Sequence, residues 1–308
     1  MNCPAHKENS HAARSPNIPL PETATHSGFA MTRRIVVALD DSRAAEQAVQ
    51  TASEIARRSA GRLSLLHVVC APVRNGTRVA SAAGVTVLEE NTSSEARVRR
   101  RLQRAGPSSA ELAVAYGVPS VEICRFAEEQ DAYLVVLGRK QHPERIRLLL
   151  GDTTDGVARR SRVPALFVPH TGTGLRRMLV ALDGSERAMQ VLERACDFAR
   201  AVGAVLHVIT VEGTCECEPG RKEPPLARSA ALQNRVSSTL SREHLPDVAV
   251  TIRRGRITDE VLKEVEAGGY DVLVIGHHRG GPGWLVQSGS TAQQLGHAAP
   301  CAVLTVPL

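Results

Sequence analysis

Aromatic residues are scarce in this sequence. The 308 residues include four Phe, three Tyr and one Trp. Proteins that hold single-stranded nucleic acid stack its bases on aromatic side chains beside a basic groove. The net charge of +6 comes almost wholly from arginine, because lysine occurs at only four positions, and no long basic run is present. We therefore expect solvated arginines on helix faces and no nucleic-acid partner.

Long apolar runs are also missing. No stretch approaches the roughly eighteen apolar residues of a membrane-spanning helix, and the first thirty residues contain no apolar signal core. We expect a cytoplasmic protein with no membrane partner. The cysteines contain no C-x-x-C pair, which disfavours disulfides and a structural zinc site. They are Cys3, Cys70, Cys124, Cys196, Cys215, Cys217 and Cys301.

What the sequence does contain is an internal repeat. Residues 33–40, RRIVVALD, are echoed by residues 176–183, RRMLVALD, at an offset of 143. Farther along the chain the offset becomes 138, where Gly138 matches Gly276 and Gly151 matches Gly289. The chain is one domain duplicated.

The repeat sets the expected domain organisation. We expect a disordered tail at residues 1–31, a first domain at 32–170, a linker at 171–174 and a second domain at 175–308. The first copy is five residues longer between the two aligned blocks. Residues 69–116 and their partner 212–254 are therefore interpreted as variable loops. The linker sequence, TGTG, favours a short flexible connection between closely packed domains.

Each copy alternates strand and helix patterns. Apolar runs predict strands buried on both faces at 35–39, 63–69, 134–138 and 166–168. Residues 43–60 and 121–129 have the spacing of amphipathic helices. The second copy repeats the strands at 178–182, 205–211, 272–275 and 303–306. This order predicts two doubly wound α/β domains with mainly parallel sheets, which bind ligands at the carboxyl ends of their strands.

Four segments of the second copy carry a family resemblance. They are VALDGSE at 180–186, DVLVIG at 271–276, GST at 289–291 and APCAVLTV at 299–306. Together they resemble the universal stress protein family, and the resemblance covers about residues 32–170 and 175–308. It implies a Rossmann-like, adenine nucleotide alpha hydrolase-like fold in each copy. It also implies that a copy with the full motif G-x2-G-x9-G-[ST] binds ATP.

The second copy keeps most of that motif. Gly276 and Gly289-Ser290 hold their positions, whereas Arg279 replaces the middle glycine. Glycines let the backbone approach phosphates, a serine that opens a helix adds a hydroxyl and free amides, and a guanidinium pairs with phosphate. The resemblance implies ATP as the ligand, with Mg²⁺ as an optional companion. The implied site residues are Ala181, Asp183, Val211, Ile275, Gly276, Arg279, Gly280, Gly289, Ser290 and Thr291.

The first copy departs further from the motif. Gln141 replaces the middle glycine, and Asp152 replaces the serine. Because a carboxylate repels phosphate, we expect this nucleotide site to be degenerate. The neighbouring basic residues are interpreted as a solvated loop; they are Arg139, Lys140, Arg145 and Arg147.

Several polar residues have two possible roles. Asp183 either contacts adenosine, as the resemblance implies, or caps the following helix. His67, whose counterpart is Thr210, is expected to be a packed or capped polar side chain. His277 is interpreted as a flank of the phosphate loop, and the pair Cys215 and Cys217 as part of an exposed polar loop.

The leading hypothesis is a non-enzymatic, ATP-binding stress-response regulator that acts through unidentified protein partners. One alternative is a tandem stress protein that binds no nucleotide and works only as a protein-interaction module. A second is a weak adenine-nucleotide hydrolase, although the sequence contains neither a Walker P-loop nor a nucleophile elbow.

The last strand of each copy, near 165–168 and 303–306, needs a partner for its outer edge. The resemblance suggests that these two edges pair with each other. Because the linker is short, pairing within the chain is favoured over pairing between chains. We expect an intramolecular pseudo-dimer, with a homodimer as the other possibility.

Overall fold

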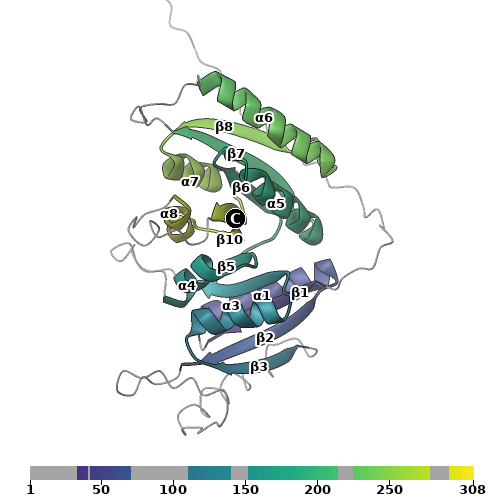
Figure 1. Cartoon of the computed structure of the whole chain (residues 1–308), viewed down its shortest axis with the longest axis vertical. Helices are drawn as coiled ribbons and strands as arrows, with labels where there is room; N and C mark the ends of the chain where they lie inside the picture. Colours follow the sequence, from purple (N-terminus) through teal and green to yellow (C-terminus); the bar gives the residue numbers. More distant parts are fainter. Residues whose placement is uncertain (1–32, 41, 71–109, 140–151, 214–224, 278–290) are drawn as a thin grey trace, which may run out of the picture.

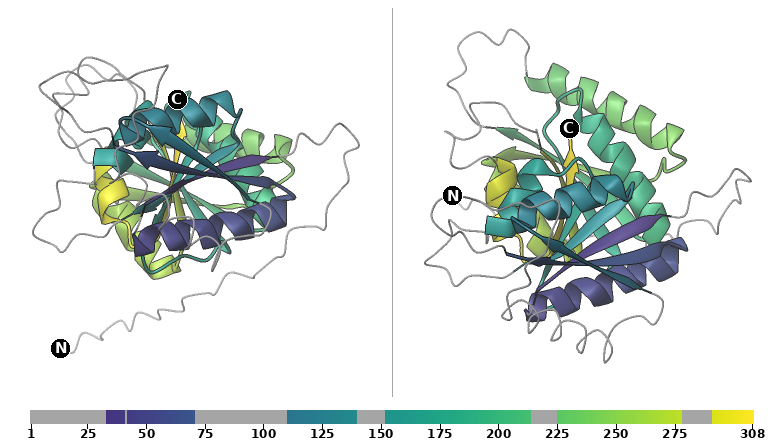
Figure 2. Two further views of the ribbon diagram at one scale, coloured as in Figure 1. Left: turned by 90° about the horizontal axis from the view of Figure 1, so that it is seen from below. Right: turned by 60° about the horizontal axis from the view of Figure 1, so that its bottom comes forward.

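The computed structural model describes residues 33–40, 42–70, 110–139, 152–213, 225–277 and 291–308. These residues form one ten-stranded sheet with helices on both faces (Figures 1 and 2). The part of the chain before the linker is called domain 1 below, and the part after it domain 2.

The described residues of domain 1 form five strands and three helices. The strands are β1 (Arg34–Leu39), β2 (Arg62–Val69), β3 (Glu111–Tyr116), β4 (Leu134–Arg139) and β5 (Ala165–Pro169). The helices are α1 (Arg43–Ser59), α3 (Pro119–Glu129) and α4 (Asp152–Arg160).

Domain 2 contributes five strands and four helices among the described residues. The strands are β6 (Arg177–Leu182), β7 (Val205–Gly213), β8 (Ala249–Gly255), β9 (Val272–His277) and β10 (Ala302–Pro307). The helices are α5 (Ala188–Val202), α6 (Pro225–Arg242), α7 (Ile257–Gly268) and α8 (Thr291–Ala298).

The strand order is β3-β2-β1-β4-β5-β10-β9-β6-β7-β8, which is the same five-strand order in each domain arranged about a central pair. That pair, β5 and β10, is antiparallel, with Leu304 opposite Leu166. All other neighbouring strands are parallel. The two edges that the sequence predicted to pair therefore do pair within one chain, at the middle of the molecule (Figure 1).

The central strands are buried on both faces, as their uninterrupted apolar runs predicted. In β1, Val37 faces the core beneath α1 and its neighbour Val36 faces the core beneath α3 and α4. The edge strands were not predicted. β3 and β8 are only half-buried. The segments 69–116 and 212–254 had been interpreted as loops, but the first contains β3, and the second contains α6 and all of β8 except Gly255. Length variation misled that interpretation, because it does not exclude regular structure.

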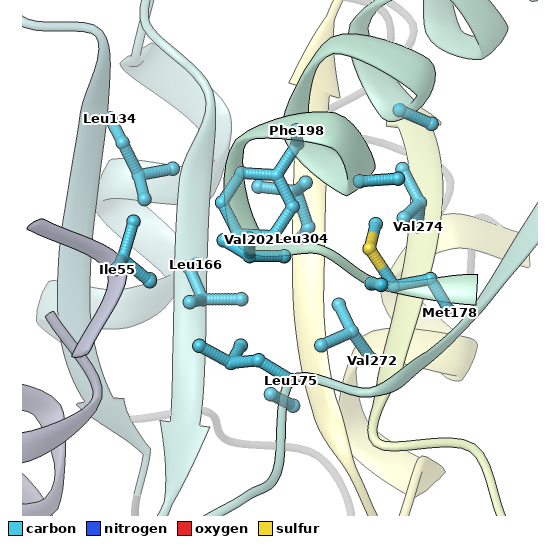
Figure 3. Close-up of a cluster of buried hydrophobic side chains, with 14 of the residues drawn as sticks. Ile55, Leu134, Leu166, Leu175, Met178, Phe198, Val202, Val272, Val274 and Leu304 are labelled. Carbon is cyan, nitrogen blue, oxygen red and sulfur yellow. The ribbon is translucent and has the colours of Figure 1, made fainter. Parts of the chain in front are cut away.

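A single apolar core crosses the domain boundary. Ile55 of α1 and Leu166 of β5 belong to the same buried cluster as Leu304 of β10 and Phe198 of α5 (Figure 3). The opposite face of the sheet holds two separate clusters, one beneath α3 and α4 and one beneath α7 and α8. One face of the sheet thus joins the domains, and the other keeps a distinct core for each.

The linker is held against domain 2. The hydroxyl of Thr173 donates to the Asp271 carbonyl at 2.6 Å, and the Asp271 carboxylate accepts from the amides of Arg176 and Arg177. The short connection that the TGTG sequence suggested is therefore a tethered one.

Candidate functional site

A cavity of about 380 Å³ opens at the carboxyl ends of β6, β7 and β9, and its size lies within the range of small-molecule sites. Six of the ten predicted site residues line it. They are Ala181, Asp183, Val211, Ile275, Gly276 and Thr291. The other four, Arg279, Gly280, Gly289 and Ser290, lie outside the described residues.

Four elements bring these residues together. Ala181 belongs to β6, Val211 to β7 and Ile275 to β9, and these strands are neighbours and parallel. Their carboxyl ends therefore meet at one edge of the sheet. Thr291 is the first residue of α8. Two apolar residues of α7, Ile257 and Val261, complete the wall. The sequence did not predict these two residues as part of the site, because only tertiary packing brings α7 against this edge of the sheet.

Asp183 is exposed at the end of β6. Its Oδ1 atom accepts a hydrogen bond from the Ser185 amide at 2.9 Å, and Gly184 between them has a φ of 78°. The side chain that bonds to the following helix is that of Ser185 and not that of Asp183. The Ser185 Oγ atom accepts a hydrogen bond from the Ala188 amide at 3.2 Å. The Asp183 bond goes to a turn residue that precedes α5, and Arg187, at the cap position of α5, makes no side-chain capping bond. The structure therefore does not make Asp183 the cap of this helix. Asp183 shapes the turn and lines the cavity.

Domain 1 has the same turn in its own copy. Asp40 accepts from the Ser42 amide at 2.9 Å, and Ser42 accepts from the Ala45 amide at 3.2 Å. The aspartate therefore stabilises the backbone after the first strand in both domains, independently of any contact with a ligand.

His67 and Thr210 also occupy matching positions. The His67 Nδ1 atom lies 3.1 Å from the Leu39 carbonyl oxygen, and the Thr210 hydroxyl donates to the Leu182 carbonyl at 3.1 Å. Both side chains are buried. Each bonds to the carboxyl end of the first strand of its domain, which agrees with the expected packed polar side chain.

Domain 1 supplies part of the cavity wall. The contributing residues are Arg139, Asp155, Ala158, Arg159 and Phe167. The interpretation of Arg139 as a solvated loop residue is wrong. It is the last residue of β4 and is only 2% exposed, because its side chain enters domain 2. There the Nη2 atom donates to the carbonyls of Ala299 and Cys301 at 2.7 and 2.9 Å.

Of the two arginines in this wall, Arg159 is exposed and Arg139 is the buried cation. Burial, and then the charge of Arg139, lower the pKa of His297. His297 lies 3.8 Å from the Asp155 carboxylate, but the lowered pKa makes this a contact of a neutral imidazole near pH 7. Burial raises the pKa of the Cys301 thiol to about 11. The cation therefore faces neutral carbonyl groups and a neutral thiol.

The described parts of the chain contain neither a metal-binding cluster nor a membrane-spanning helix. These residues contain no group of three or more His, Cys, Asp or Glu side chains placed to hold a metal ion. None of their helices combines the length and the apolar character that crossing a membrane requires. Cys215, Cys217 and the predicted tail lie outside the described residues.

The fold and the comparisons agree on the class of protein. Two doubly wound, Rossmann-like domains of the adenine nucleotide alpha hydrolase-like type stand in tandem. The sequence model of the universal stress protein family matches residues 31–169 and 174–307. The chain therefore belongs to the universal stress protein family, as a tandem member.

Solved structures show the same fold over most of the chain. A universal stress protein from Archaeoglobus fulgidus DSM 4304 is 20% identical, with a TM-score of 0.67 over 90% of this chain and 99% of that one. A functionally unknown protein from Pseudomonas aeruginosa PAO1 is 18% identical, with a TM-score of 0.61 over 90% and 93%. A search of curated proteins finds no significant match.

Proposed function

We propose that domain 2 binds ATP and that the protein is a cytoplasmic stress-response regulator, which reports occupancy of this site to protein partners. One observation carries the proposal. The predicted nucleotide residues that the structure describes line a single cavity at the edge of the sheet where doubly wound folds bind ligands.

The described residues suit the parts of a nucleotide. Val211, Ile257 and Val261 offer aliphatic surface to an adenine ring. The Asp183 carboxylate can accept hydrogen bonds from ribose hydroxyls. The amino end of α8 begins at Thr291, and helix amino ends favour phosphate oxygens. Mg²⁺, when bound with ATP, would neutralise phosphate charge.

We propose binding without turnover. Most side chains that line the cavity are aliphatic, which suits recognition by shape more than proton transfer. The proposed output is a change in the surface offered to partner proteins when the site is filled. An ATP hydrolysis rate that rises with protein concentration and is lost in a cavity variant would contradict this part.

The matched pair Asp183→Ala and Asp40→Ala tests the site. Both variants lose the same 2.9 Å bond to a backbone amide, and Asp40→Ala also loses a bond from the Ser42 hydroxyl. Asp183→Ala is therefore expected to lower the free energy of unfolding by about 1 kcal/mol, and Asp40→Ala by somewhat more. Asp183→Ala should also weaken ATP binding about tenfold, because a charged hydrogen bond to ribose is lost. Titration calorimetry measures the affinity, and urea unfolding measures the stability.

Asp40→Ala is the control, with wild-type ATP affinity expected. If both variants lose stability and keep the wild-type affinity, Asp183 is scaffold alone. Equal losses of affinity in the two variants would remove the assignment of the site to domain 2.

A further inference from the structure

The Arg139 side chain ends in domain 2, against the carboxyl end of α8. Its Nη1 atom donates to the Gly296 carbonyl at 2.6 Å, and its Nη2 atom donates to the carbonyls of Ala299 and Cys301. The last carbonyls of a helix lack partners within that helix, and a cation there is favoured by the helix dipole. Domain 1 therefore supplies the carboxyl-terminal cap of a helix in domain 2.

In domain 1 the turn that follows the matching helix is closed by a residue of the same domain. At the end of α4, the Ser161 hydroxyl donates to the Val163 carbonyl at 2.6 Å, and the Val163 amide donates back to Ser161 at 3.1 Å. The repeat offset of 138 places Ala299 at the position of Ser161 and Cys301 at that of Val163. An alanine cannot make the local bond. In domain 2 the Cys301 carbonyl accepts from Arg139 instead.

The arrangement is not reciprocal. The residue of domain 2 that matches Arg139 is His277, at the end of β9. At this position only domain 1, whose nucleotide motif is degenerate, has an arginine. Its guanidinium caps α8 of domain 2, whose motif is nearly complete.

The capped helix is a wall of the cavity. The lining includes Thr291, Ala292, Leu295 and Gly296 of α8, and Arg139 itself. Any shift of α8 would move this wall and the helix amino end that begins at Thr291.

We propose that Arg139 is a positioning residue for the nucleotide site of domain 2, and that domain 1 is retained as the anchor of α8. The inference deepens the proposed function and rests on it. Nucleotide affinity in domain 2 then depends on a side chain of domain 1. By linkage, a bound nucleotide strengthens the hold of α8 on Arg139.

The test compares Arg139→Met with Arg58→Met in the full chain. Arg58 is the matched control, because it also crosses to domain 2, where its Nη1 atom donates to the Val202 carbonyl at the end of α5 at 2.7 Å. Val202 does not line the cavity. ATP affinity is measured by titration calorimetry well below the melting temperature. Hydrogen exchange of α8 amides is measured without nucleotide.

Arg139→Met should weaken ATP binding about tenfold, within the usual range of coupling between sites, and should speed exchange in α8 by a similar factor. Arg58→Met should leave both at wild-type values. Adding Ala299→Ser to Arg139→Met restores the serine turn seen in domain 1, which replaces the contact to the Cys301 carbonyl but not those to Gly296 and Ala299, and should recover part of both losses. Arg139→Lys, which keeps the cation, should lie between wild type and Arg139→Met.

The two proposals fail in different ways. In one outcome the wild type does not bind ATP, whereas hydrogen exchange in α8 is fast in Arg139→Met and slower when Ala299→Ser is added. That outcome would contradict the proposed function and support Arg139 as the anchor of α8. Wild-type affinity and wild-type α8 exchange in Arg139→Met overturn the anchor. Equal losses in Arg139→Met and Arg58→Met also overturn it, because they would reflect general stability alone.

Discussion

Gly138 and Gly276 hold matching positions near the ends of β4 and β9, but different atoms fill the space beside them. A Cβ atom on Gly138 would lie 2.3 Å from the carbonyl carbon of Ala44, in the backbone of α1. A Cβ atom on Gly276 would lie 2.7 Å from Cγ2 of Val191 and 3.0 Å from Cδ1 of Leu308. The family motif and close packing therefore both explain these glycines.

This difference predicts an order of stability. Gly276→Ala should cost about 1–2 kcal/mol, because side chains, of which Leu308 moves more easily than the buried Val191, have to shift. Gly138→Ala should cost about 3 kcal/mol or more, because a helix backbone cannot move aside. Gly296→Ala in α8 is the control. Apart from its chain neighbours and the backbone of α8, nothing lies within 4 Å of its Cβ position, so a gain of about 0.5–1 kcal/mol is expected. Urea unfolding followed by circular dichroism ranks the three, and a Gly276→Ala loss as large as that of Gly138→Ala would contradict the packing account.

The residues of the site differ in how far the sequence could reveal them. Asp183 and Gly276 were implied by the family resemblance, and each lies at the end of a strand pattern that the duplication displays twice. Arg139 was misinterpreted. Its partners lie 157 to 162 residues later in the chain, and only the packing of the two domains brings them together. A buried arginine and a solvated one have the same local sequence signal.

At the scale of elements, the pairing of β5 with β10 forms the interface between the two domains. Thr305 of β10 adds a hydroxyl bond to the Ala165 carbonyl at 3.3 Å. Beside this pair, α1 and α5 share one apolar core, and Leu166 and Leu304 lie at its centre (Figure 3). Cutting the chain at the linker would expose a strand edge and apolar surface on each half.

Residues 32–170 and 175–308, produced as separate chains, should therefore self-associate. Pairing of β5 with β5, or of β10 with β10, replaces the lost contact, and mixing the two halves in equal amounts should favour the native pair. Sedimentation velocity over a range of concentrations measures the association, with the intact chain run alongside. Halves that stay monomeric and soluble at high concentration would contradict the role assigned to this interface.

At the scale of the whole molecule, duplication made the architecture predictable. Because the same order of strand and helix patterns occurs twice in the sequence, it predicts two doubly wound domains. The edge strands β3 and β8 escaped prediction because they lie in or at the end of the two segments whose length differs between the copies, which were interpreted as loops. The contribution of domain 1 to the cavity of domain 2 also escaped, because it comes from contacts such as that of Arg139 with Ala299, which no repeat comparison displays.

We propose that the two halves have diverged into a nucleotide-binding domain and a supporting domain. Domain 2 carries the cavity and the nearly complete motif. Domain 1 carries Asp152 in place of the motif serine and contributes a wall and a helix cap to its neighbour. A shared core keeps this geometry fixed.

The most direct test of this account is a crystal structure of the intact protein grown with saturating ATP. We predict one nucleotide per chain, with its base beside Val211 and Ile257, its ribose at Asp183, and no nucleotide at the carboxyl ends of β1, β2 and β4. Three results would contradict the proposal that domain 2 alone binds ATP: a nucleotide at that edge of domain 1, equal occupancy of both domains, or an empty cavity in domain 2.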